Sequence, residues 1–166
     1  MGIDVFQVVS LFIALLVSLS VHESAHAWAA NRLGDPTAHD LGRISMNPLV
    51  HADLFGTFLV PLISFFGGFM FGWAKPVPVN TARLRNPKRD YMLVAAAGPA
   101  SNLLMAGGLL LVLVLLKASS SSMELLINQV ARQVATVDSV LVLMTSIAYF
   151  GMLINVVLAI FNMIPV

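Results

Sequence analysis

The 166-residue sequence contains no cysteine, which excludes disulfide bonds and thiolate metal sites. Any metal would have to be bound by histidine or carboxylate side chains. Charged residues make up only 10% of the chain, whereas a soluble domain carries about a quarter. So few charges cannot cover the surface of a water-soluble protein, and lipid must therefore form much of the solvent around this chain. The net charge of +1 gives no indication of nucleic-acid binding.

Four long stretches with few or no charges are candidates for membrane segments. They cover residues 3–30, 54–74, 91–116 and 139–166. At 1.5 Å per residue, the first would form a helix about 40 Å long, enough to cross a bilayer with some tilt. We therefore expect an all-α membrane protein, a multi-span helical bundle that forms one domain over residues 1–166.

The basic residues indicate how this bundle is oriented. Residues 75–90 hold five basic side chains against Asp90 alone, whereas the polar loop from Lys117 to Asp138 holds two basic and two acidic ones. By the positive-inside rule, the first loop is cytoplasmic and the second lies outside. The first apolar stretch then runs from outside to inside.

The second apolar stretch is not expected to cross the membrane in the ordinary way, because both of its flanks are predicted to be cytoplasmic. Pro61, the glycine pair at 67–68 and the extended run GWAKPVPVN at 72–80 also interrupt a regular helix. Irregular backbone is tolerated at membrane depth only where protein or a wet cavity covers it. We favour a short re-entrant or extended segment near residues 66–80, with a full crossing as the alternative.

His22, Glu23 and His26 form the pattern H-E-x-x-H within the first stretch. On a helix, side chains four residues apart project from one face, so both imidazoles can reach one Zn²⁺. The carboxylate of Glu23 can then act as general base on a metal-bound water. Buried polar groups that merely satisfy one another are the alternative, but such residues are costly at lipid depth and by default functional.

A catalytic zinc site usually has three protein ligands, and the third is not evident. The candidates between the first two stretches are His39, Asp40, His51 and Asp53. Each is more typical of a loop or a helix cap than of a metal ligand. The residues themselves therefore leave the third ligand unassigned.

Several separated motifs in the sequence resemble those of the site-2 protease family. VHESAHAWAA at 21–30 is similar to the zinc helix of that family. Its compact bacterial and archaeal members have segments similar to LGRISMNPLVHADLFGT at 41–57 and FGWAKPVPVN at 71–80. AAAGPASN at 95–102 resembles the family's G-x-x-x-N stretch, and NMIP at 162–165 resembles the start of N-x-x-P-x-x-x-x-D-G. The ordered set is more specific than H-E-x-x-H alone.

This resemblance implies an intramembrane zinc metalloprotease that takes part in regulated intramembrane proteolysis. Such an enzyme hydrolyses peptide bonds in or next to transmembrane segments of its protein substrates. One Zn²⁺ per chain would be bound by His22 and His26, with Glu23 as the general base. The family's third ligand is the aspartate of the last motif, which would lie beyond Val166. We therefore expect a protease core truncated at its C-terminus before the third ligand, and inactive in that form.

The resemblance also suggests where the protein acts and with what. We expect an integral multi-pass protein of a prokaryotic inner membrane, with its active site toward the cytoplasm. Its partners would be the lipid bilayer and a transmembrane protein substrate, and not nucleic acid. The sequence does not indicate the identity of the substrate or the oligomeric state.

Two asparagines are candidates for contacts with the substrate or the transition state. Gly98 allows a close helix approach, and Asn102 can form a hydrogen bond across it, although a packing role is equally compatible. Asn162, near the inner end of the fourth stretch, can donate to a developing oxyanion or to substrate backbone. Packing is again the alternative for Asn162.

Two functions of other classes are also compatible with part of the sequence. A non-catalytic membrane protein could bind metal structurally or serve as a scaffold. Metal transport would need polar residues along a path through several helices, but the last two stretches offer only scattered Ser, Thr and Asn.

The run at 72–80 can pair as an edge strand with an extended peptide, although its prolines would instead block such pairing.

Overall fold

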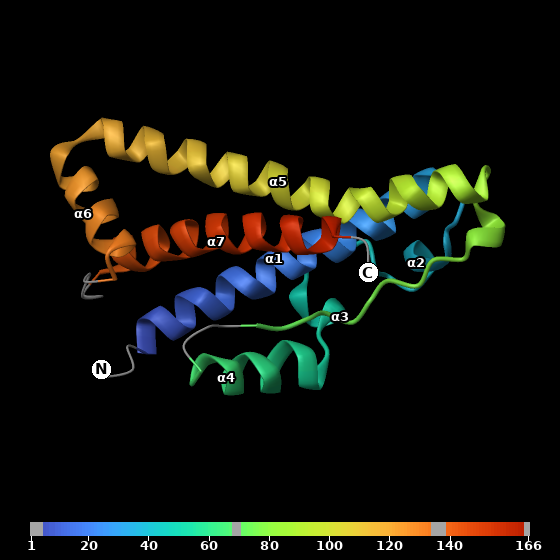
Figure 1. The fold of residues 1–166 in the computed structure, drawn as a ribbon, viewed down its shortest axis with the longest axis horizontal. Coiled ribbons are helices and arrows are strands. Elements are labelled where there is room, and N and C mark those ends of the chain that lie inside the picture. Colours follow the sequence, from blue (N-terminus) through green and yellow to red (C-terminus); the bar gives the residue numbers. More distant parts are fainter. Residues whose placement is uncertain (1–4, 68–70, 134–138, 165–166) are drawn as a thin grey trace.

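Three long helices form the body of the computed structural model, which describes residues 5–67, 71–133 and 139–164 (Figure 1). They are α1 (Val5–Arg32), α5 (Pro87–Ser119) and α7 (Val140–Met163), and each packs against the other two. All three are long and apolar enough to cross a membrane, and the described residues contain no β-strand. The expected all-α membrane bundle is thereby confirmed.

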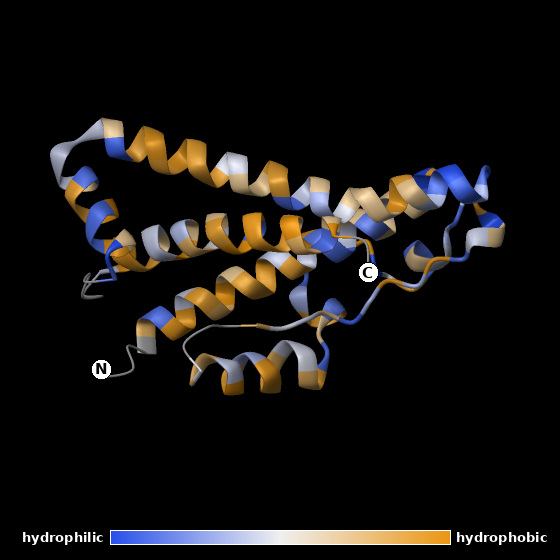
Figure 2. Cartoon of the chain, viewed as in Figure 1, coloured by the Kyte–Doolittle hydropathy of each residue, from blue (hydrophilic) through white to orange (hydrophobic). Residues whose placement is uncertain are grey.

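The lipid-facing surface follows from where the large apolar side chains lie. Leu104 and Leu111 of α5 and Ile160 and Phe161 of α7 are all more than half exposed. Figure 2 shows hydrophobic residues along the middle of these helices, while hydrophilic residues gather near the start of α5. A soluble protein would bury such side chains, so this surface fits a bilayer rather than water.

The second apolar stretch forms a segment that runs out and returns instead of a fourth long span (Figure 1). The π-helix η1 (Leu54–Leu59) and the helix α4 (Val60–Phe65) lead away from residues 48–51, and residues 71–80 return past them in an extended conformation. The Trp73 N–H donates to the Gly56 carbonyl at 3.0 Å, and the Phe71 N–H donates to Ser64 Oγ at 2.9 Å.

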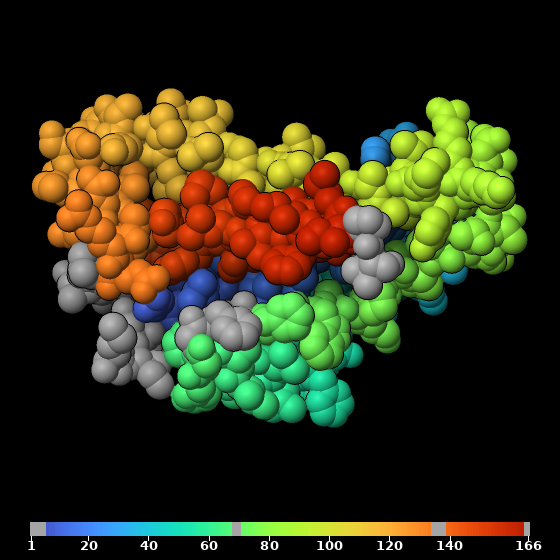
Figure 3. All heavy atoms as spheres, in the orientation of Figure 1, coloured from blue at the N-terminus to red at the C-terminus, as the bar shows by residue number. Residues whose placement is uncertain are grey.

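These hydrogen bonds tie the returning segment to the outgoing helices, so both ends of the segment lie at the same end of the bundle. The predicted re-entrant, extended segment is therefore present, although residues 68–70 lie outside the described residues. In the space-filling view, the returning segment lies between α4 and α7 (Figure 3).

The polar loop expected between Lys117 and Asp138 is instead partly helical. Ser120 ends α5 in an extended conformation, and its hydroxyl accepts a hydrogen bond from the Met123 N–H at 3.2 Å. This cap starts a new helix, α6 (Ser121–Ala131), because serine satisfies one of the free N–H groups of a first turn. Residues 134–138, including Asp138, lie outside the described part of the chain.

Short helices connect the long ones near the site. They are α2 (Thr37–Asp40), α3 (Pro48–His51) and the 3₁₀ helix η2 (Thr81–Arg83). Within the bundle, Asn155 of α7 donates to Ser18 Oγ of α1 at 2.7 Å, and both residues are completely buried. Polar contacts of this kind stabilise helix packing in membranes, where apolar burial between helices gives no advantage over lipid.

Candidate metal centre

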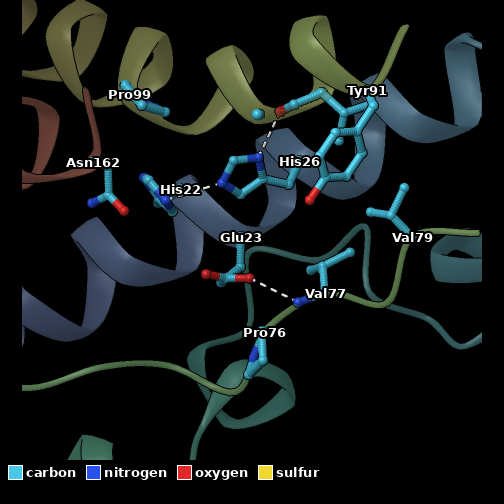
Figure 4. A pocket seen from close by; sticks show the side chains of 11 residues that line it. His22, Glu23, His26, Pro76, Val77, Val79, Tyr91, Pro99 and Asn162 are labelled. Carbon is cyan, nitrogen blue, oxygen red and sulfur yellow. Dashed lines mark hydrogen bonds between the residues drawn. The ribbon is translucent and has the colours of Figure 1, made fainter. Parts of the chain in front are cut away.

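The imidazoles of His22 and His26 meet on the face of α1 that packs against α5 (Figure 4). Their Nε2 atoms are 3.0 Å apart. Two nitrogens that bind one tetrahedral metal at 2.0–2.1 Å would be about 3.3 Å apart. The two rings therefore already have nearly the spacing that a shared zinc ion requires.

Each imidazole is held on its other side by α5. Nδ1 of His26 lies 2.7 Å from the carbonyl oxygen of Val94, which can only accept a hydrogen bond. The His26 proton must therefore be on Nδ1, which leaves Nε2 with a lone pair for a metal. Nδ1 of His22 lies 3.1 Å from the amide nitrogen of Asn102.

Gly98 makes the close approach of α1 and α5 possible. A Cβ atom at this position would lie 2.6 Å from Cε1 of His22 and would overlap the ring of His26. Any side chain here would therefore push the two helices apart or move both imidazoles. Small residues are typical of such crossings in membrane proteins.

Glu23 points from α1 toward the returning extended segment (Figure 4). Its Oε2 accepts a hydrogen bond from the Val77 N–H at 2.9 Å, whereas Oε1 has no hydrogen bond within the described residues. Proline stands on both sides of Val77, so neither neighbour offers a competing N–H group. The carboxylate is thus oriented by backbone and keeps one oxygen free.

A cavity of about 340 Å³ is lined by the side chains of His22, Glu23 and His26. Its walls come from α1, the returning segment, α5 and α7, with Asn162 at the α7 side (Figure 4). A second cavity of about 620 Å³, lined mainly by apolar residues, shares His22, Glu23 and Asn162 with the first. It extends along α1 between residues 71–74 and α7.

The two asparagines predicted as site residues have different surroundings. Asn162 is exposed and borders both cavities, and its amide donates to the Leu158 carbonyl of its own helix at 2.8 Å. Asn102 is completely buried beside His22 and borders neither cavity. Pro165 of the same motif as Asn162, and Val166, lie outside the described residues.

The four candidates for a third ligand lie in short helices and one cap: His39 and Asp40 in α2, His51 at the end of α3, and Asp53 before η1. Asp53 caps η1 by accepting from the N–H groups of its first turn, and His39 pairs with Asp40 at the surface. His51 is buried, with its Nε2 2.9 Å from the Ser45 carbonyl oxygen. Among the described residues, no group of three such side chains is arranged to hold a metal. The site therefore contains two ligand candidates and one carboxylate base candidate.

Asp35, which sequence reasoning did not single out, anchors the returning segment to the end of α1. It is completely buried, and its carboxylate accepts from the Asn80 N–H at 2.6 Å and from the Thr37 hydroxyl at 2.5 Å. Burial alone would raise the pKa of Asp35, but these hydrogen bonds and the nearby charge of Arg83 outweigh it, so the pKa lies below its ordinary value.

The local signal for Asp35 is its place before Pro36 and Thr37, which is typical of a capping turn. Its bond to Asn80 joins residues far apart in the chain and has no such signal. Because Asn80 follows Val77 closely, this anchor helps to hold the Val77 N–H against Glu23.

Comparisons with known proteins identify the family of the chain. The chain matches the model of Peptidase family M50 over residues 10–166. A Bacillus subtilis (strain 168) protein described as "Putative zinc metalloprotease YwhC" is 45% identical over 92 residues. The match covers 55% of this chain and 39% of that relative, so the chain corresponds to well under two thirds of the relative's length.

No solved structure matches the chain. The family model nevertheless covers nearly all of the sequence, and the motifs around His22, Gly98 and Asn162 fall inside it. The chain therefore belongs to peptidase family M50, the site-2 protease family.

Proposed function

We propose that this chain forms the zinc-binding core of an intramembrane metalloprotease. The observation that carries the proposal is the pair of imidazole Nε2 atoms 3.0 Å apart, in a cavity that also contains the Glu23 carboxylate. Membership of family M50 and the description of the Bacillus relative as a zinc metalloprotease support it.

His22 and His26 would hold the zinc ion, because their Nε2 atoms converge and their Nδ1 atoms contact α5. When bound, zinc polarises a carbonyl and lowers the pKa of a water molecule to about 7. We assign the third ligand to the aspartate that follows the NMIP motif in the family. The assays described below therefore use the full-length protein.

Glu23 would act as the proton carrier of the reaction. The Val77 N–H occupies Oε2, so Oε1 is free to take a proton from the attacking water. The same oxygen can then return the proton to the leaving amine. The Val77 contact limits rotation of the carboxylate, and Glu23 lines the cavity together with His22 and His26.

The apolar cavity indicates which substrates the site accepts. It is lined by Leu15 and Leu19 of α1, residues of the returning segment, and α7 residues up to Phe161, and it leads to Glu23. An apolar peptide from a transmembrane segment matches this lining. Because an intact helix keeps its carbonyls hydrogen-bonded within the helix, such a substrate would have to unwind before cleavage.

Asn162 stands where the two cavities meet, so its amide can donate to substrate backbone or to a developing oxyanion. Only one of its two N–H groups is used by the Leu158 carbonyl, so the other can make this contact. We further propose that the protein is a multi-pass protein of a prokaryotic inner membrane and acts in regulated proteolysis. Its site would face the cytoplasm, because the basic residues of 75–90 lie near the histidine end of α1.

The experiment is a cleavage assay of the complete protein in liposomes, with a membrane-protein substrate and the variant Glu23→Gln. We expect cleavage to fall at least about 10²-fold, because glutamine cannot accept the proton. Glu124→Gln, in an exposed pair with Lys117, is the matched control and should cleave as the unmodified protein does. Unchanged cleavage by Glu23→Gln would reject the proposed role, and zinc binding without any cleavage would favour a structural metal site.

A further inference from the structure

The amide of Asn102 is buried against His22 but uses only one of its two ends. The side chain is completely buried, and its nitrogen lies 3.1 Å from Nδ1 of His22. Its oxygen has no hydrogen-bond partner among the described groups. A buried, unpaired amide oxygen is costly and calls for an explanation.

Which nitrogen of the His22 ring carries the proton depends on which end of the Asn102 amide faces the ring. An amide nitrogen donates, so Nδ1 of His22 must accept and the ring proton must be on Nε2. That proton then points at Nε2 of His26, 3.0 Å away, and closes a hydrogen bond between the two histidines. In this state His22 has no lone pair for a metal.

A half-turn of the Asn102 amide about its Cβ–Cγ bond would move the proton of His22 from Nε2 to Nδ1. The oxygen of Asn102 would then accept a proton from Nδ1 of His22, and the lone pair of His22 Nε2 would face that of His26. Within the described residues neither end of the amide has another hydrogen bond, so this turn breaks only the one to His22 and leaves the nitrogen, instead of the oxygen, without a partner. His26 needs no such change, since the Val94 carbonyl already fixes its proton on Nδ1.

We propose that Asn102 is a positioning residue that places His22 in its metal-binding tautomer by presenting its amide oxygen to Nδ1. The inference rests on the proposed zinc site. It assigns different control to the two ligands: His26 is held by the Val94 carbonyl, whereas His22 contacts both the backbone of Gly98 and a side chain that can turn. Asn102 would thus act on zinc affinity and not on the substrate.

The test measures the zinc affinity of the complete protein by competition with a chelator. Asn102→Leu has a similar size but no acceptor, and we expect its zinc affinity to be 10- to 100-fold lower, the usual effect of losing a partner of a metal-bound histidine. Asn102→Asp keeps an acceptor and should bind zinc more tightly than the leucine variant. The control is Asn155→Leu, since Asn155 is equally buried with an unpaired oxygen but contacts Ser18 instead of a histidine.

A second readout follows the proton itself. The ¹⁵N NMR signals of His22 in the zinc-loaded protein should show a protonated Nδ1, and Asn102→Leu should remove the hydrogen bond from this Nδ1 to residue 102 and shift its signal. Wild-type zinc affinity in Asn102→Leu, or equal loss in the Leu and Asp variants, would overturn the inference. If the unmodified protein binds zinc but never cleaves, the proposed function fails while the role of Asn102 is still decided by these affinities.

Discussion

The crossing of α1 and α5 at Gly98 yields a sharp prediction, because the smallest possible side chain added there meets both candidate zinc ligands. In the variant Gly98→Ala, the new Cβ would lie 2.6 Å from Cε1 of His22. Carbon atoms in contact are about 3.5–4.0 Å apart. The ring or the helix must therefore move by about 1 Å.

The fold should survive this shift although the site does not. Alanine in place of glycine favours a helix by roughly 0.5–1 kcal/mol, and overpacking costs about 1–3 kcal/mol. The net destabilisation is then at most about 2.5 kcal/mol. A displacement of about 1 Å in a catalytic site can cost about 10²-fold in rate. We expect a helical protein with weaker zinc binding and about 10²-fold slower cleavage.

The assay compares zinc affinity, cleavage rate and far-ultraviolet circular dichroism of the complete protein in liposomes. Gly107→Ala is the matched control, because it lies in the same helix and a Cβ there meets nothing within 4 Å. This control should keep its zinc affinity and gain slightly in stability. Full zinc binding and cleavage by Gly98→Ala would refute the close approach described for this site.

Two further predictions concern contacts away from the metal. Because the pKa of Asp35 is lowered in the folded protein, its contribution to stability is present above the ordinary value of about 3.9 and is lost as the pH falls through the folded value. The protection of the Asn80 amide against hydrogen exchange, relative to its intrinsic rate at each pH, should therefore fall only on strong acidification, and Asp35→Asn should remove this pH dependence; equal protection in the variant would contradict the anchor. Asn155→Ala should lower the free energy of unfolding in micelles by about 0.6 kcal/mol and at most about 1.7 kcal/mol, and an unchanged value would show that the bond to Ser18 contributes nothing.

The parts of the site that the sequence predicts are those set by local geometry. His22, Glu23 and His26 lie within one helix turn, so their spacing alone places both imidazoles on one face. The three long helices follow from runs with few or no charges, and the re-entrant segment follows from basic flanks and Pro61. Each of these signals is contained in a short window of sequence.

The remaining contacts join residues that are far apart in the chain. The bond between Glu23 and Val77 depends on how the returning segment is anchored at Asp35, and no short window contains these partners. For Asn102, sequence reasoning could place the residue beside a close helix contact but could not identify His22 as its partner. The helix α6 was missed because serine is compatible with both a polar loop and a helix cap.

The central claim is that His22 and His26 bind one zinc ion through Nε2, and X-ray absorption at the zinc edge of the complete protein tests it most directly. We predict histidine nitrogen ligands at about 2.0–2.1 Å, and loss of bound zinc in the double variant His22→Ala/His26→Ala. Zinc bound with an unchanged spectrum in the double variant would contradict the account.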